Sequence, residues 1–161
     1  MPEKIVDREA PSKLLELAFK APRWLFRMRL GGLLGNRFLL LRHTGRVSGQ
    51  PRETVLEVAG YNPESDVYFV VSAYGANADW YLNLLKTPQA QISVGRRTIE
   101  VRAEKLAPAE SGELIVSYAR EHPTAIKQLS RFMGYKVDGT EEDYYALGEM
   151  LHAVALIPGS P

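Results

Sequence analysis

Cysteine is absent from this chain of 161 residues. That absence excludes disulfide bonds, thiolate nucleophiles, iron–sulfur clusters and cysteine-ligated zinc. No apolar run is long enough to cross a bilayer, and the N-terminus lacks the basic-then-apolar pattern of a signal peptide. The net charge of +1 gives the chain no general attraction to nucleic acid. We therefore expect a cytoplasmic protein with no nucleic-acid partner.

Common catalytic and nucleotide-binding motifs are also missing. Gly49 is followed by Gln50 rather than by the Lys-Ser/Thr pair of a Walker A loop, and no G-x-G-x-x-G or G-x-S-x-G is present. The three histidines, at positions 43, 122 and 152, are far apart in sequence, and no H-E-x-x-H occurs, so no metal site is expected. These absences favour chemistry that is supplied by a bound cofactor.

The most informative segment that is present spans residues 41–52, Leu-Arg-His-Thr-Gly-Arg-Val-Ser-Gly-Gln-Pro-Arg, between two apolar stretches. Glycine allows a sharp turn and close approach of an anion to backbone N–H groups. Arginine adds fixed positive charge with paired donors that match phosphate or carboxylate. The segment predicts either a site for a phosphorylated ligand or an ordinary basic hairpin loop.

Residue patterns along the chain predict an α+β protein. Alternating or continuous apolar runs indicate about six strands, at 38–41, 53–59, 67–72, 91–94, 97–105 and 152–157. Helices are expected at 80–86, with Asp79 as N-cap, and at 108–121, 124–132 and 141–150. The acidic residues 141–143 are expected to lie in solvent at the start of the last helix. Because strands and helices do not alternate regularly, we expect a small, mostly antiparallel barrel with peripheral helices.

The chain divides into residues 1–37, expected to be helical, and residues 38–161, expected to form the barrel domain. Within 13–34, basic residues are interleaved with tryptophan, phenylalanine and leucine. Such a segment either packs over the barrel with its charges in water or lies on an anionic membrane surface. Peripheral membrane contact is therefore an alternative to a purely cytoplasmic location.

Three motifs in order resemble the deazaflavin-dependent nitroreductase family. They are Thr-Gly-Arg-Val-Ser-Gly-Gln-Pro-Arg at 44–52, Val-Ser-Ala-Tyr-Gly at 71–75 and Asp-Trp-Tyr-Leu-Asn-Leu at 79–84, followed by Pro88. Members of that family are oxidoreductases that use coenzyme F420. Their fold is a split β-barrel related to the flavin-binding pyridoxamine-phosphate-oxidase-like fold. The resemblance implies this fold and this cofactor here.

The resemblance also implies two groups of cofactor-binding residues. The first would hold the phosphate and the glutamate tail of F420 through side chains and backbone N–H groups: Arg42, Arg46, Ser48, Gly49, Gln50 and Arg52. The second would contact the deazaflavin ring and its ribityl chain: Ser72, Ala73, Tyr74, Gly75, Trp80, Tyr81 and Asn83. Alternatively, Trp80 simply fills the barrel interior. Ser72 and Tyr74 are the candidates for delivering a proton to the reduced acceptor, with Tyr118, Tyr135, Tyr144 and Tyr145 as further ones.

The expected reaction is hydride transfer from reduced F420 to a hydrophobic electrophile such as a quinone, enone or nitro compound. Nitroimidazole-activating members carry closely spaced tyrosines in a region that corresponds to residues 122–129, where this chain has none, so a quinone or enone is favoured over a nitro compound. Two alternatives remain open: an FMN-binding reductase or oxidase, and a non-catalytic protein that binds lipids or other small apolar molecules. Both a monomer and a homodimer are compatible with a split barrel.

Overall fold

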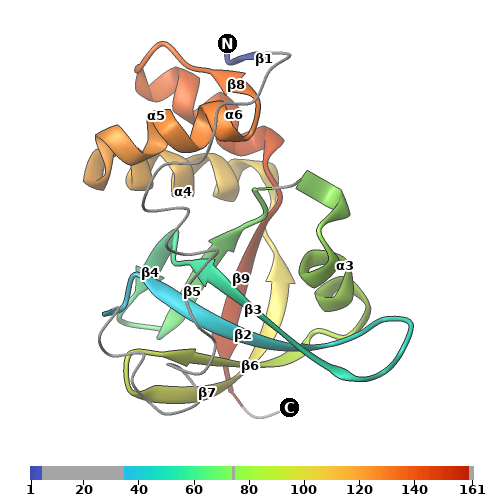
Figure 1. Cartoon of the computed structure of the whole chain (residues 1–161). Coiled ribbons are helices and arrows are strands. Elements are labelled where there is room, and N and C mark those ends of the chain that lie inside the picture. Colours follow the sequence, from blue (N-terminus) through green and yellow to red (C-terminus); the bar gives the residue numbers. More distant parts are fainter. Residues whose placement is uncertain (5–34, 74, 160–161) are drawn as a thin grey trace.

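A computed structural model describes residues 1–4, 35–73 and 75–159 of the chain. The expectations for residues 13–34 and for Tyr74 therefore lie outside the described residues. Seven strands form one antiparallel sheet in the order β3-β2-β6-β7-β9-β5-β4 (Figure 1). Their bounds are Phe38–Thr44 for β2, Pro51–Glu57 for β3, Gly60–Asn62 for β4, Val67–Val71 for β5, Gln89–Val94 for β6, Arg97–Lys105 for β7 and Ala153–Pro158 for β9.

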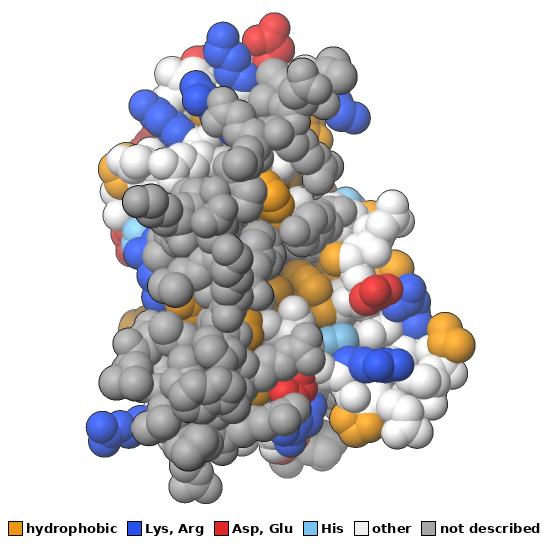
Figure 2. Space-filling view, in the orientation of Figure 1, with side chains coloured by type: hydrophobic (Ala, Val, Ile, Leu, Met, Phe, Trp, Pro, Cys, Tyr) orange, Lys and Arg blue, Asp and Glu red, His pale blue; other side chains and the backbone are white. Residues whose placement is uncertain are grey.

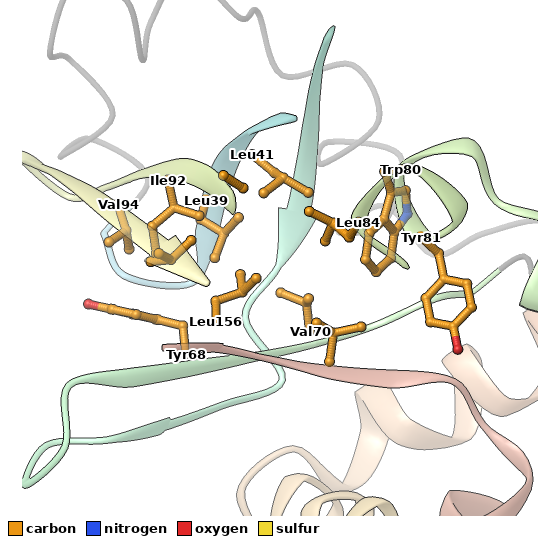
Figure 3. Packing of buried hydrophobic residues seen from close by; sticks show 13 residues of the cluster. Leu39, Leu41, Tyr68, Val70, Trp80, Tyr81, Leu84, Ile92, Val94 and Leu156 are labelled. Carbon is orange, nitrogen blue, oxygen red and sulfur yellow. The ribbon is translucent and has the colours of Figure 1, made fainter. Parts of the chain in front are cut away.

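The sheet curls so that its two ends approach each other. Directly after β3, the Ala59 N–H donates a 2.8 Å hydrogen bond to the carbonyl of Phe69 in β5. Inside the curl lie apolar side chains that alternate along the strands, and Leu39, Leu41 and Ile92 are completely buried. Figure 3 shows Trp80 and Leu84 at one end of this cluster and Ile92 and Val94 at the other. This architecture is the α+β split barrel that the sequence predicts.

Helices cover the barrel in two places. Three of them, α4 (Pro108–Glu121), α5 (Pro123–Phe132) and α6 (Glu141–Met150), form a layer over one end of the barrel (Figure 1). Their apolar faces enclose a second cluster with Ile115, Ile126 and Leu147. Helix α3 (Asp79–Lys86) lies apart from this layer, beside the long β2–β3 hairpin, and follows a short 3-10 helix, η2 (Gly75–Asn77). A two-stranded sheet pairs β1 (Glu3–Lys4) with β8 (Tyr135–Lys136).

The structure corrects several local predictions. The main sheet has seven strands rather than about six, because the short β4 after β3 was missed. Ala78, not Asp79, is the N-cap of α3. Asp143 is buried, not solvated, and receives the N–H of Asp138 at 2.8 Å. Within the described ranges, no helix has the length and apolar character needed to span a membrane.

Candidate functional site

A groove of about 780 Å³ opens between the β2–β3 hairpin and helix α3. Figure 2 shows a hollow on this face, in which a histidine and hydrophobic side chains lie beside Lys or Arg side chains. The lining residues come from both strands of the hairpin, its turn and the start of α3: His43, Gly45, Arg46, Val47, Ser48, Arg52, Glu53, Thr54, Asn77, Ala78, Asp79, Trp80 and Asn83. The first and third sequence motifs therefore meet in space, although Arg46 and Asn83 lie 37 positions apart in the sequence.

The hairpin turn uses much of its own backbone hydrogen bonding. The Gly45 N–H donates to the Gln50 carbonyl and the Gly49 N–H to the Gly45 carbonyl, each at 2.9 Å. The Gln50 N–H donates to Ser48 Oγ at 3.2 Å. In this conformation the N–H groups of Gly49 and Gln50 are therefore engaged within the turn, and their predicted role in holding an anion stays a prediction. Gly49 instead supplies the turn with a positive φ of 69°, which glycine adopts without strain.

Arg46 is fixed to helix α3 by several hydrogen bonds. Its backbone N–H and its Nη1 both donate to Asn83 Oδ1, at 3.0 and 2.9 Å, and its Nη2 lies 3.1 Å from Asp79 Oδ1. Lys86 Nζ donates to the Arg46 carbonyl at 2.7 Å. The carboxylate and the amide thus take up part of the donor capacity that the resemblance assigned to a cofactor anion. Arg46 keeps its place at the groove, but its first task is to hold the hairpin against α3.

Arg52 is different, since no hydrogen bond or ion pair engages its side chain within the described part of the chain. It leaves β3 opposite His43, in the register that pairs these two residues. A guanidinium that lines a groove and has no protein partner is a ready donor for phosphate or carboxylate. Among the predicted anion-binding residues, Arg52 fits that role best.

Arg42 does not line the groove. It is one residue out of phase with Leu41 and His43, so its side chain leaves the opposite face of β2. There it donates to Glu53 Oε1 at 3.0 Å and to Gln91 Oε1 at 3.4 Å. The strand pleat directs Arg42 to the outer surface, and its predicted role at the rim of the cofactor site stays a prediction that this position does not favour.

His43 and Asn83 form a buried pair at the groove. Both are at most 5% exposed, and Asn83 Nδ2 lies 3.0 Å from His43 Nδ1. Burial is the main cause that lowers the pKa of His43, with a smaller contribution from the positive charge of Arg52 and opposition from Asp79. His43 is therefore neutral near pH 7. Asn83, expected to support the ring or ribityl chain, directs its amide to His43 and Arg46 instead.

The loop after β5 is shaped by Ser72. This residue is 1% exposed, its Oγ donates to the Gly75 carbonyl at 2.6 Å, and its N–H donates to the His152 carbonyl at 2.9 Å. Because the hydroxyl proton is already engaged and buried, this geometry argues against Ser72 as a proton donor. Ala73 packs toward the helical layer, against the cluster of Phe132 and Met133.

The aromatic residues of α3 have separate places. Trp80 belongs to the barrel core and also lines the groove. This position agrees with filling of the barrel interior and leaves contact with the deazaflavin ring as a prediction. Tyr81 is 2% exposed, and its ring lies 5.4 Å from that of His152 between the barrel and the helices. Tyr81 therefore packs in the core and does not line the groove. The groove also lacks Gly75 and Gln50 among its lining residues.

Proton donors from the last third of the chain are not placed at this groove. Tyr118 donates from its hydroxyl to Glu57 Oε1 at 2.7 Å. Burial, followed by the negative charge of Glu57, raises the pKa of this phenol. Tyr118, Tyr135, Tyr144 and Tyr145 are all absent from the groove lining. In the part of the chain that the structure describes, no cluster of three or more acidic or histidine side chains could hold a metal ion.

Sequence reasoning missed His43, Thr54 and Asp79 as groove residues. The signal for His43 was present, because it continues the inward alternation of Leu39 and Leu41 at the end of the same strand. Thr54 and Asp79 line the groove only because the fold places the hairpin and α3 side by side, and the sequence does not indicate this arrangement. The assembled groove combines two guanidinium groups, a serine hydroxyl and an apolar wall at Trp80. This donor set fits a ligand that joins a planar ring to an anionic chain.

Comparison with known proteins identifies related chains. A family model described as F420H(2)-dependent quinone reductase matches residues 25–131. A putative F420H(2)-dependent quinone reductase of Mycobacterium bovis and an F420H(2)-dependent quinone reductase of Mycobacterium tuberculosis are each 34% identical over 86 residues. Each alignment covers 48% of this chain and 56% of the relative, so the chain matches about half the length of these curated relatives. These names give no support to the FMN alternative.

Solved structures with low sequence identity share the fold. An F420-H2 dependent reductase (FDR-A) has a TM-score of 0.52 and 17% identity, with 76% of this chain and 95% of that chain covered. The protein Rv2991 of Mycobacterium tuberculosis has a TM-score of 0.53 and 15% identity, with 98% and 86% covered. A third structure, a domain-swapped dimer, has a TM-score of 0.51 and 16% identity, with 83% and 96% covered. At these identities the similarity establishes the split-barrel architecture.

Proposed function

The chain belongs to the F420H(2)-dependent quinone reductase family, and from this premise we propose that its groove binds F420 and that it reduces a quinone. The observation that supports the cofactor site most directly is Arg52, a guanidinium without a hydrogen-bonding partner among the described residues, at the edge of a groove with an aromatic wall. F420 combines a planar deazaflavin with a phosphodiester and a carboxylate tail, which matches that combination. Reduced F420, when bound, supplies the hydride.

The chain contributes binding and orientation. Arg52 holds the phosphate or tail, with Ser48 as an additional hydroxyl donor at the turn. Trp80, which lines the groove from the barrel core, and the small side chain of Ala78 provide apolar surface against which a planar ring can pack. Holding the reacting partners in contact accounts for a large part of such catalysis. Ser72 keeps the loop before α3 in shape through its bond to Gly75.

The acceptor is a small hydrophobic electrophile, and we propose a quinone as the first choice. An enone or a nitro compound has the same need for a hydride and a proton, and each is a further candidate substrate. A proton can arrive from water, because the groove is open to solvent on its outer side. No tyrosine or serine hydroxyl of the described residues needs to supply it.

The test is anaerobic mixing of the protein with reduced F420 and a water-soluble benzoquinone, following the absorbance of oxidised F420. We expect turnover by the wild type and by Arg42→Ala, whose side chain lies on the outer face. Arg52→Ala should raise the KM for reduced F420 at least tenfold. Binding of F420 without oxidation by any quinone would contradict the proposed acceptor, and absence of F420 binding would contradict the proposed cofactor.

A further inference from the structure

We propose that His43 is a positioning residue: its neutral ring fixes the Asn83 side chain in the one orientation that holds Arg46 in the groove. This hydrogen-bonded arrangement of His43, Asn83 and Arg46, the lock, is a property of the free protein. Its effect on cofactor affinity rests on the proposed function. Three residues from three elements take part, with His43 in β2, Arg46 in the hairpin turn and Asn83 in α3.

The direction of each hydrogen bond follows from chemistry. The backbone N–H and the Nη1 of Arg46 are both donors, and both contact the same Asn83 atom, so this atom must be the amide oxygen. The other end of the Asn83 amide is then its NH2 group, which donates to His43 Nδ1 at 3.0 Å. His43 Nδ1 must accept, and its proton therefore resides on Nε2.

The surroundings favour this neutral form. The charged residues that line the groove together with His43 are Arg46 of the turn, Arg52 and Glu53 of β3, and Asp79 of α3. Strand β6, which pairs with β2, carries no ionisable residue. Burial of the ring, followed by the positive charge of Arg52, lowers the pKa of His43 from the ordinary value, and Asp79 opposes this shift.

Protonation of the His43 ring would break its hydrogen bond with the Asn83 amide. A proton on Nδ1 would place a donor opposite the NH2 of Asn83, and the amide would have to turn away. Its oxygen would then leave both donors of Arg46, and the hairpin would keep only the contacts of Arg46 with Asp79 and Lys86 of α3. Cofactor affinity should therefore fall as the pH drops through the pKa of His43. A direct effect of the added positive charge would have the opposite sign, since it would strengthen binding of an anionic cofactor.

The first test uses nuclear magnetic resonance on the free protein. Long-range ¹H–¹⁵N spectra of the histidine rings report the tautomer, and the backbone amide of Arg46 reports the hydrogen bond to Asn83 Oδ1. We expect an Nε2–H tautomer for His43 at neutral pH and an Arg46 amide shift with the same midpoint as the ring. In His43→Leu the shift of the Arg46 amide with pH should disappear. His122, which lies at the α4–α5 junction, serves as an internal control.

Two results would overturn the proposal: an Nδ1–H tautomer for His43, or an Arg46 amide that does not follow the titration of the ring. Both results are measured on the wild-type protein, so the test does not depend on whether the His43→Leu variant folds.

The second test measures F420 affinity between pH 5 and 8 for the wild type and for His43→Asn, which keeps an acceptor near the position of Nδ1 but does not titrate. The ratio of the two affinities cancels any titration of the cofactor. We expect the wild type to lose at least threefold in affinity relative to His43→Asn at the acidic end. A relative gain on acidification would overturn the lock, whereas no F420 binding at any pH would contradict the proposed function and leave the spectroscopic test to stand alone.

Discussion

Arg46 and Arg52 carry the same charge at the same groove, but the fold engages them differently. Arg46 is attached to Asn83 and Asp79, while Arg52 has no hydrogen bond or ion pair in the described part of the chain. An arginine whose donors are already satisfied contributes less new binding energy to a ligand than one whose donors are free. The two arginines should therefore separate into a structural and a binding role.

Arg52→Ala should lower F420 affinity by roughly 10- to 100-fold, because a hydrogen bond to a charged group contributes about 1.5–3 kcal/mol. The free energy of unfolding should change by less than about 0.5 kcal/mol, as for most surface substitutions. Fluorescence titration and urea unfolding measure the two quantities. Arg42→Ala is the matched control, since it removes an arginine from the outer face of the adjacent strand. Equal losses of affinity in both variants would contradict the assignment.

Asn83→Ala should destabilise the protein by about 2–4 kcal/mol, because it leaves His43 Nδ1 and the Arg46 N–H without their buried partner. Asn77→Ala, an exposed asparagine of the same groove, should change the free energy of unfolding by less than about 0.5 kcal/mol. Urea denaturation of the two variants measures the difference. A similar stability of both would show that Asn83 does not hold the hairpin.

Much of the residue-scale site was predictable from motif order, but the division of tasks was not. Five of the residues that the resemblance assigned to cofactor binding line one groove, and they are Arg46, Arg52, Ser48, Trp80 and Asn83. Whether the donors of Arg46 and Arg52 are already engaged depends on how α3 packs against the hairpin. A local sequence pattern does not predict that packing. Arg42 shows the reverse case, because its position next to the inward-facing His43 in β2 is sufficient, once the strand is placed, to direct this side chain to the outer face.

At the scale of elements, the helical layer depends on close contact between α4 and α6. A Cβ at Gly148 would lie 2.5 Å from the Ser111 carbonyl oxygen and 2.6 Å from the Gly112 Cα. Both neighbours are backbone atoms, so the helices would have to move apart. Gly148 is therefore required by packing and not by backbone conformation.

Gly148→Ala should lower the free energy of unfolding by about 1–3 kcal/mol, the usual range for overpacking a tight interface. The intrinsic helix preference of alanine acts in the opposite direction, so a loss would isolate the steric effect. Glu149→Ala, at the adjacent exposed position of α6, should be close to neutral. Thermal unfolding followed by circular dichroism compares them, and a more stable Gly148→Ala protein would contradict this packing.

Two turns at the far end of the barrel are joined by an ion pair. Arg97 Nη1 donates to Asp66 Oδ1 at 3.0 Å, and the hydroxyl of Tyr61 donates to the same oxygen at 2.8 Å. Asp66 also has a φ of 57°, a conformation that asparagine tolerates as well. The hydrogen bond from Arg97, followed by that from Tyr61, lowers the pKa of Asp66.

Asp66→Asn keeps the turn conformation and removes the charge, so it should cost no more than about 1 kcal/mol for a partly exposed pair. Because the pKa of Asp66 is lower in the folded protein, this contribution is present above the unfolded pKa of about 3.9 and is lost as the pH falls through the folded value. Urea unfolding at neutral and strongly acidic pH should therefore show a difference that vanishes in acid. A difference that persists in acid would mean that the charge is not its source.

The elements themselves were largely predictable, since long apolar alternation and flanking turns mark β7 and the helices clearly. Short pairings were not: β4 consists of Gly60–Asn62 and exists because β5 lies beside it, not because its residues favour strands. Asp143 likewise had the pattern of a solvated helix start and is buried by its contacts with residue 138 and with the N-terminal amino group of Met1.

For the molecule as a whole, the order of strands explains where the groove lies. Strand β3 is an edge strand of the sheet, and α3, which follows β5 in the chain, contacts its neighbour β2. The hairpin at this edge of the sheet therefore lies beside the helix that carries the third motif. The α+β class and an antiparallel barrel followed from patterning and the split barrel from the family resemblance, whereas this juxtaposition is a property of the complete topology.

Equilibrium titration of the purified protein with F420 and, separately, with FMN determines whether this groove is an F420 site. Cofactor fluorescence gives both dissociation constants, and circular dichroism verifies that the protein is folded. We predict tight F420 binding, FMN binding at least tenfold weaker, and an F420 affinity that depends on Arg52 but not on Arg42. Preference for FMN, or no binding of either cofactor by the folded protein, would contradict an F420 site in this groove.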